Sequence, residues 1–130
     1  MLTTKAITRA APSAGATIDF SGTWTNQVGS TAVLAMAGQR LTGRYRSPVS
    51  GGGGSIDGDI TGWAEGDLIS FIVNWDTSAS LTAWSGQLVA EGGRDVIKTL
   101  WLLVQNVPDT NEPTGLWQST LAGADEFWRV

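Results

Sequence analysis

The sequence predicts an all-β protein, an eight-stranded antiparallel up-and-down β-barrel, on three observations. Turn-forming residues recur roughly every 8 to 14 residues from Ile18 onward, and the segments between them are short. No segment sustains the period of about 3.6 residues that an amphipathic helix requires. Most joints are tight, so consecutive strands should pair as hairpins, and such a meander can close on itself without a free edge.

The predicted strands are joined by short turns except at two longer joints, residues 48–55 and 106–114. They cover residues 19–28, 31–37, 40–47, 56–64, 67–75, 80–90, 94–105 and 115–130. The first of these joints precedes the fourth strand and contains four consecutive glycines, Gly51 to Gly54. We expect residues 18–130 to form one barrel domain and residues 1–17 to form a flexible N-terminal arm.

Side chains on a strand alternate between its two faces, so a period of two identifies the inward residues. In the first strand, Asn26 and Ser30 share a face with Trp24 and Val28. Three later strands each carry an aromatic residue on the equivalent face. The inward sets are Ile69, Phe71, Val73 and Trp75; Ser80, Thr82, Trp84 and Gly86; and Ile97, Thr99, Trp101 and Leu103.

The opposite faces of the same three strands are apolar, although a lone barrel in water should be polar outside. These residues are Leu68, Ile72, Leu81, Ala83, Val89, Val96, Leu100, Leu102 and Val104. We therefore expect this outer face to be buried against another copy of the chain.

Composition excludes several classes of function. The chain has no cysteine and no histidine, which removes disulfides, thiolate nucleophiles, zinc–cysteine sites and the commonest general base. The net charge is −4 and the eight Lys and Arg residues are scattered, so we expect neither nucleic acid nor a membrane as a partner. The carboxylates show no paired spacing suited to catalysis, so we expect no enzyme, no cofactor and no metal.

The inferred interior gathers aromatic and small polar side chains at one place. An eight-stranded barrel has room for packed side chains or for one small ligand. Either the tryptophans form a core in which the polar groups bond one another, or the set lines a ligand pocket. The set is Trp75, Trp84 and Trp101 with Asn26, Ser30, Tyr45, Ser47, Ser80, Thr82 and Asp125.

Six segments, in this order, resemble the avidin and streptavidin family across about residues 20 to 130. They are GTWTNQVGS from Gly22, LTGRYRS from Leu41, VNW from Val73, LTAWSGQ from Leu81, TLWLL from Thr99 and LWQSTLAGAD from Leu116. The absence of cysteine makes the chain more similar to the cysteine-free, bacterial, streptavidin-like members.

The resemblance implies high-affinity, non-covalent binding of biotin at the open end of the barrel. The ureido oxygen of biotin would accept hydrogen bonds from Asn26, Ser30 and Tyr45. The two ureido N–H groups would donate to Asp125 and Ser47.

The remaining implied contacts surround the ring and the valerate chain. Thr82 would meet the thioether sulfur, and Ser80 and the backbone N–H of Gly51 would meet the carboxylate. The walls would be Trp75, Trp84, Trp101, Val28, Val49 and Leu103. At Gly51 streptavidin carries Asn, and a run of glycines is expensive to order on binding.

The resemblance also implies an assembly and a location. Trp117 matches the family position whose indole closes a neighbouring subunit's pocket, which implies a homotetramer. Family members suggest a secreted or periplasmic protein, although residues 1–16 contain no apolar run of a signal peptide.

Two other functions stay open from the sequence alone. One is a barrel that carries a different small ligand, and the other is a protein-binding or inhibitory barrel. The joint occurrence of Asn26, Ser30, Tyr45, Ser47 and Asp125 favours biotin, because a generic barrel has no need of all five.

Overall fold

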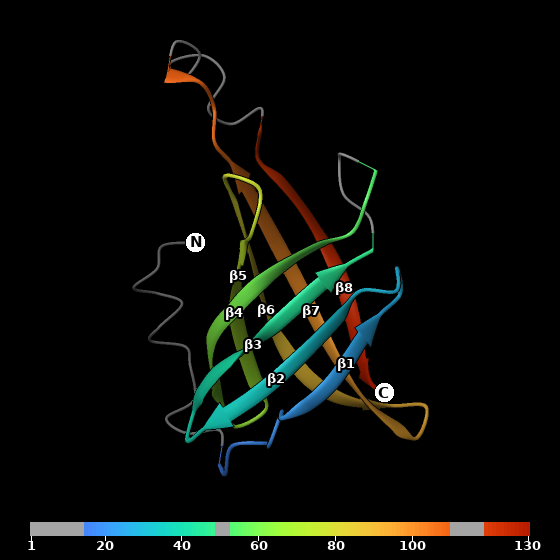
Figure 1. Cartoon of the computed structure of the whole chain (residues 1–130). Helices are drawn as coiled ribbons and strands as arrows, with labels where there is room; N and C mark the ends of the chain where they lie inside the picture. The colour runs from blue at the N-terminus through green and yellow to red at the C-terminus, as the bar shows by residue number, and fades with distance from the viewer. Residues whose placement is uncertain (1–14, 49–52, 110–118) are drawn as a thin grey trace, which may run out of the picture.

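The computed structural model describes residues 15–48, 53–109 and 119–130. In this part of the chain, eight strands form a closed antiparallel barrel in which each strand pairs with its sequence neighbours and the last pairs with the first (Figure 1). The strands are β1 Gly22–Asn26, β2 Thr31–Ala37, β3 Arg40–Ser47, β4 Ile56–Glu65, β5 Leu68–Trp75, β6 Ser80–Glu91, β7 Arg94–Gln105 and β8 Leu121–Arg129. The predicted fold class is confirmed. The described residues include no helix with the length and apolar character needed to cross a membrane.

β1 is shorter than predicted at both ends. At its start, Asp19 Oδ1 accepts a hydrogen bond from the backbone N–H of Ser21 at 2.9 Å, so this N–H is bonded locally and not to a neighbouring strand. At its end, the C=O of Asn26 accepts from the N–H of Gly29 at 3.1 Å, and Gly29 has a φ of 82°. Glycine adopts this left-handed conformation without strain, so a tight turn replaces the last two residues of the predicted strand.

β8 begins at Leu121, whereas the last strand was predicted from residue 115. Ser119 and Thr120 precede the strand, and the Ser119 hydroxyl donates to the C=O of Gln105 at 3.2 Å. Residues 115–118 lie outside the described residues. The six strands from β2 to β7 agree with the prediction to within one residue at each end.

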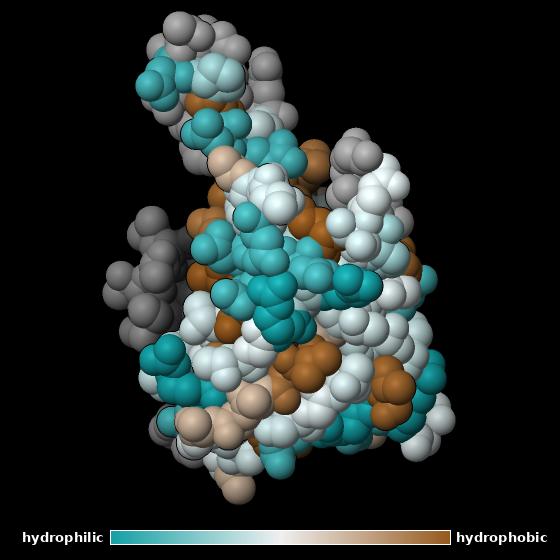
Figure 2. All heavy atoms as spheres, in the orientation of Figure 1, coloured by the Kyte–Doolittle hydropathy of each residue, from teal (hydrophilic) through white to brown (hydrophobic). Residues whose placement is uncertain are grey.

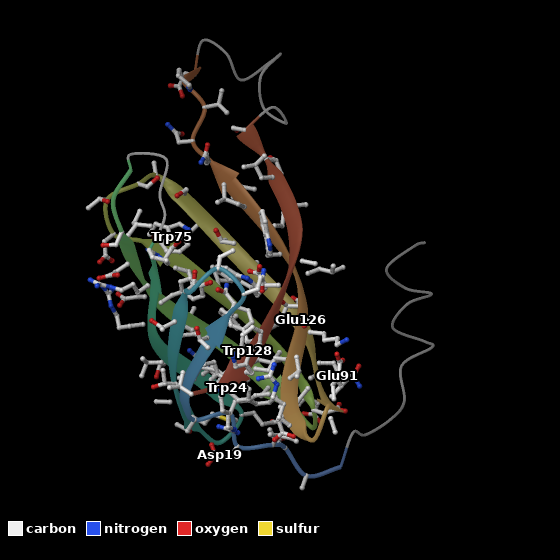
Figure 3. All side chains as sticks on the ribbon, turned by 90° about the vertical axis from the view of Figure 1, so that its right-hand side faces the viewer. Asp19, Trp24, Trp75, Glu91, Glu126 and Trp128 are labelled. Carbon is white, nitrogen blue, oxygen red and sulfur yellow. The ribbon has the colours of Figure 1, made fainter. Side chains whose placement is uncertain are left out.

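One end of the barrel is packed with apolar side chains. Phe20, Trp24, Leu41, Ile97 and Phe127 are almost completely buried there. Figure 3 shows Trp24 and Asp19 toward this end and Trp75 toward the opposite end. The space for a ligand is therefore at the Trp75 end.

The packed end is closed by the segment 18–21, which precedes β1. The indole Nε1–H of Trp24 donates to the C=O of Phe20 at 2.8 Å. The Arg129 guanidinium, from the end of β8, donates to the C=O of Ser21 at 2.9 Å and of Asp19 at 2.7 Å. It also lies 4.3 Å from the centre of the Trp24 ring, a cation–π contact. Arg129 thus ties the end of β8 to the segment before β1 across the base of the barrel.

The outer surface carries exposed apolar side chains, mostly over β5 to β7. Figure 2 shows one face of the molecule, on which hydrophobic and hydrophilic residues are interspersed. The exposed apolar residues of β5 to β8 are Leu68, Ile72, Leu81, Leu100, Leu102, Val104 and Leu121.

Val96 differs from this prediction. It was predicted with the apolar outer face, yet only 3% of it is exposed. It pairs with Trp128 of β8, and the Arg94 guanidinium lies 4.9 Å from the centre of the Trp128 ring. A large neighbour on the adjacent strand therefore covers a residue that strand alternation alone places in solvent.

Candidate functional site

A cavity of about 420 Å³ opens at the Trp75 end of the barrel. Its walls come from the β1–β2 turn and from β1, β3, β5, β6, β7 and β8, so it is the mouth of the barrel itself. The lining residues are Asn26, Gln27, Val28, Ser30, Tyr45, Ser47, Trp75, Thr82, Trp84, Trp101, Leu103, Gly123, Ala124 and Asp125.

A larger hollow of about 680 Å³ lies over the outer side of β6 to β8. Its exposed lining is mainly apolar and includes Leu68, Val89 and Leu100. It belongs to the apolar outer face, so the barrel mouth is the better candidate for a small polar ligand.

Asn26 is held rigidly by its own turn. Its Oδ1 atom accepts from the backbone N–H of Val28 at 3.2 Å and of Ser30 at 2.9 Å. Its Nδ2 atom donates to the Tyr45 hydroxyl at 3.2 Å. These bonds fix which way the amide points, and Nδ2 keeps a second hydrogen for another acceptor.

Tyr45 is a buried phenol inside an aromatic cluster. Its ring stacks on Trp84 at 4.7 Å between centroids and meets Trp75 edge-on at 5.6 Å. Burial raises the pKa of Tyr45 to about 12, the hydrogen bond with Ser30 acts in the opposite direction, and the charge of Asp125 adds to the increase. Tyr45 therefore stays protonated at neutral pH and can donate a hydrogen bond.

Asp125 is held by two donors. Gln27 Nε2 donates to one carboxylate oxygen at 2.6 Å, and the Trp84 Nε1–H donates to the other at 2.8 Å. The Gln27 Oε1 atom in turn accepts from the backbone N–H of Glu126 at 3.1 Å. An ionised carboxylate has about four acceptor positions, so Asp125 retains capacity for a donor on a ligand.

Gln27 was not among the predicted site residues. Strand alternation places it on the outer face, opposite Asn26. A turn was predicted at Gly29, but it begins two residues earlier, directly after Asn26, and Gln27 contacts Asp125 of β8 instead.

The tryptophan walls are held by specific contacts. The Trp75 Nε1–H donates to the Thr82 hydroxyl at 2.9 Å. Trp84 and Trp101 are paired across β6 and β7. A Cβ atom on Gly123 would lie 2.5 Å from Cζ2 of Trp101, so the indole occupies the space that any larger residue would need. Gly123 and Ala124 were also missed, because small residues in a strand carry no distinctive signal.

The other predicted residues differ in their placement. Ser47 and Leu103 line the cavity, and Val28 lies at its mouth with 58% of its surface exposed. Ser80 does not line the cavity; its hydroxyl donates to the Ser78 hydroxyl at 2.9 Å, and it borders a separate hollow beside Asn74. Three predicted residues, Val49, Gly51 and Trp117, lie outside the described residues.

The cavity combines neutral donors with one carboxylate acceptor between aromatic walls. The part of the chain that the structure describes leaves no buried side-chain nitrogen or oxygen without a hydrogen-bond partner. Without a ligand, some polar groups of the cavity therefore already bond one another, as in the alternative of a packed core. Such an arrangement suits a small planar molecule that presents a carbonyl oxygen on one side and N–H groups on the other.

Comparison with known proteins gives a consistent picture. Residues 14–130 match the model of the Avidin family. Avidin-related protein 4/5 from Gallus gallus is 31% identical over 119 residues, which cover 85% of this chain and 77% of the relative. Avidin from Gallus gallus is 29% identical over 121 residues, covering 85% and 78%. The crystal structure of Xenavidin superposes with a TM-score of 0.73 at 26% identity, covering 86% of this chain and 97% of that chain. The chain therefore belongs to the Avidin family.

Proposed function

We propose that the chain is a binding protein, not an enzyme, that holds biotin without covalent attachment in the barrel mouth. The observation that carries the proposal is the convergence of Asn26, Ser30 and Tyr45 on one side of the cavity with Asp125 beside them. Family membership supports the same ligand. The cavity volume of about 420 Å³ is within the range of small-molecule sites.

The ureido group would take the deepest polar positions. The second Nδ2 hydrogen of Asn26 and the hydroxyls of Ser30 and Tyr45 would donate to the ureido oxygen. Asp125 and Ser47 would accept from the two ureido N–H groups. Because Asn26 and Asp125 are already fixed by protein hydrogen bonds, binding would order few side chains, which favours affinity.

The rest of the ligand would be held mainly by apolar contact. Trp75, Trp84 and Trp101 would enclose the bicyclic ring. The Thr82 hydroxyl accepts from Trp75 and would direct its own hydrogen at the thioether sulfur. Toward the mouth, Val28, Val49 and Leu103 would line the valerate chain, and the backbone N–H of Gly51 would meet its carboxylate.

We further propose that the protein is secreted or periplasmic, as its family membership suggests, and that it is a homotetramer, on two supports. The exposed Leu68, Ile72, Leu100 and Leu102 form an apolar outer surface that association with other copies would bury. Trp117 occupies the family position that closes a neighbouring pocket. Light scattering at micromolar concentration tests the assembly, and a monomer would contradict it.

Titration with biotin tests the function. Tryptophan fluorescence should change until one biotin is bound per chain, and excess biotin should raise the melting temperature. Asp125→Ala should weaken binding strongly. Asp95→Ala serves as a matched control, since Asp95 is exposed and follows the β6–β7 turn at the packed end. Unchanged fluorescence and melting at excess biotin would refute the proposal and leave a different ligand as the alternative.

A further inference from the structure

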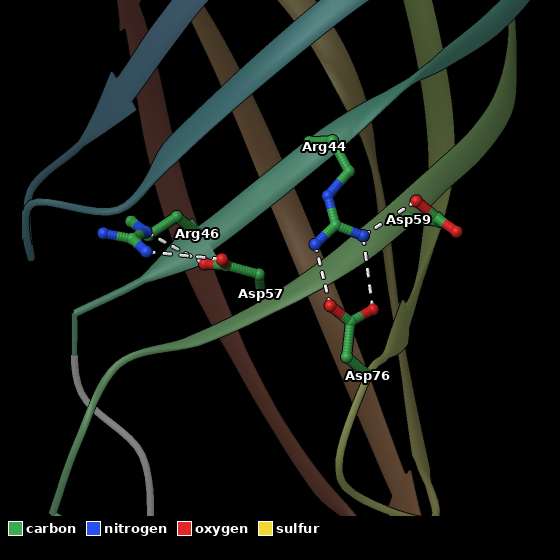
Figure 4. A network of polar contacts seen from close by, with 5 residues as sticks. All are labelled: Arg44, Arg46, Asp57, Asp59 and Asp76. Carbon is green, nitrogen blue, oxygen red and sulfur yellow. Dashed lines mark hydrogen bonds and ion pairs between the residues drawn. The ribbon is translucent and has the colours of Figure 1, made fainter.

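An ionic network joins two strands and the connection between β5 and β6 on the outside of the barrel, next to the cavity. Arg44 of β3 makes a bidentate contact with Asp76, at 3.2 Å through Nη1 and 2.7 Å through Nη2 (Figure 4). The same Nη1 atom donates to Asp59 of β4 at 2.8 Å. The two aspartates raise the pKa of Arg44, and Arg44 lowers the pKa of Asp76.

Asp76 links this network to the cavity wall. It directly follows Trp75 and is the first residue of the four-residue connection between β5 and β6. Its backbone N–H donates to the C=O of Asp57 of β4 at 3.0 Å. The start of the connection is therefore attached to β4 by its backbone and to β3 by its side chain.

Trp75 depends on this attachment because it lies at the very end of β5. Its indole donates to Thr82 at 2.9 Å and packs edge-on against Tyr45 inside the cavity. A shift of the backbone at Asp76 would be transmitted to the adjacent Trp75 and thus to the shape of the cavity wall.

We propose that Arg44 and Asp76 are positioning residues that hold the β5–β6 connection, and through it Trp75, in the geometry that retains a bound ligand. The part that concerns ligand release rests on the proposed function. The part that concerns the order of the connection stands without any ligand.

The network differs from an isolated surface ion pair. Single exposed ion pairs contribute little to stability, whereas a bidentate arginine–carboxylate contact that is shared with a third charged group has a defined geometry. Arg44 is about half exposed, so dissolved salt should weaken the network, since the screening length falls to about 3 Å at 1 M salt. Ligand retention should therefore depend on salt.

The chain provides a matched control pair. Arg46 of β3 contacts Asp57 of β4 at 2.9 Å and 3.3 Å, with similar exposure of the arginine. This pair joins the same two strands as Arg44 and Asp59. Asp57 meets the β5–β6 connection through its backbone C=O, which a substitution of its side chain retains. Asp76→Asn and Asp57→Asn each remove one negative charge and weaken one arginine contact, and only the first should release the connection.

The first measurement uses the full chain without ligand. Amide hydrogen exchange of residues 74–80, followed by mass spectrometry at low salt, should be about 2- to 5-fold faster in Asp76→Asn than in the unmodified protein. Asp57→Asn should leave it unchanged, and 1 M salt should remove the difference. Equal exchange in Asp76→Asn and the unmodified protein, or equal acceleration by both substitutions, would overturn the proposal.

The second measurement is the dissociation rate of labelled biotin. Asp76→Asn should release biotin about 2- to 5-fold faster at low salt, with a melting temperature equal to that of Asp57→Asn. Faster exchange without faster release would refute the role in ligand retention. If the unmodified protein fails to bind biotin, the proposed function fails, while the exchange measurement still decides whether Arg44 and Asp76 position the connection.

Discussion

Gly123 allows a quantitative test of how closely the cavity wall is packed. In Gly123→Ala, the new Cβ would lie 2.5 Å from Cζ2, 2.7 Å from Cε2 and 2.9 Å from Nε1 of Trp101. Ordinary carbon contacts are about 3.5 to 4.0 Å, so the indole must move by about 1 Å. Both residues line the cavity, and the movement therefore changes the surface that a ligand meets.

The size of the effect follows from the cost of overpacking, about 1 to 3 kcal/mol. If Trp101 moves freely in the empty protein, the melting temperature changes little and the full cost appears in binding. The biotin dissociation constant then rises on the order of 5- to 100-fold. If Trp101 cannot move, the empty barrel loses that stability instead. Both quantities must therefore be measured on the same variant.

Calorimetric titration with biotin and thermal melting of the empty protein provide these two quantities. Ala122→Ser is the matched control, because Ala122 is the preceding residue of β8 and its side chain is exposed. Ala122→Ser should change neither the biotin affinity nor the melting temperature. Unchanged affinity and unchanged melting in Gly123→Ala would refute the close packing of Trp101 on β8.

Three further predictions concern single residues. Tyr45 is the sole tyrosine, so phenolate absorbance reports this one group, and its titration should give a pKa of about 12. The free energy of unfolding should be at its full value below about pH 10, the ordinary tyrosine pKa, and should fall as the pH rises through 12. A pKa near 10 would show that Tyr45 is not buried. Gln27→Ala removes a donor to Asp125 and should speed biotin release about 10-fold, as expected for the loss of a hydrogen bond to a charged group. The melting temperature should change little, because Gln27 is exposed. Equal release rates would contradict this role. Arg129→Met removes two hydrogen bonds and the cation–π contact with Trp24. Urea denaturation should show the empty barrel destabilised by about 1 to 3 kcal/mol, and biotin affinity should not change. An unchanged free energy of unfolding would refute the role of Arg129 at the packed end.

The central strands could be predicted from the sequence because the local alternation of inward and outward side chains determines which of their residues are buried. In β5, the residues predicted to face inward, among them Ile69, Phe71 and Val73, are buried, while Leu68 and Ile72 are exposed. Here the period of two continues to the ends of the strand. The same rule therefore brings Trp75, Thr82, Trp84 and Trp101 to one cavity.

The prediction errors lie where the period of two ends, or where a strand distant in sequence determines whether a side chain is buried. The turn at Gly29 ends β1 early and redirects Gln27 toward Asp125. Trp128 covers Val96 only because β7 and β8 pair in one register. These effects depend on backbone geometry and on register, which no local pattern in the sequence specifies.

Some of the site could be assigned from the sequence only by resemblance. Alternation indicates that Asn26 and Asp125 face inward, but not that Asn26 is fixed by its own turn or that Trp84 donates to Asp125. Ser80 illustrates the limit: it lies at the first position of β6, where its hydroxyl meets Ser78 and not the cavity.

The most direct test of the central claim separates ligand binding from stability in one double variant. Asn26→Ala combined with Ser30→Ala removes two proposed donors to the ureido oxygen. Titration calorimetry should show that the unmodified protein binds one biotin per chain and that the double variant binds it at least about 100-fold more weakly, a loss of about 3 kcal/mol. Urea denaturation of the empty proteins should show a smaller loss of stability. Equal affinity, or a loss of stability that exceeds the loss of binding free energy, would show that these residues serve the core and not the ligand.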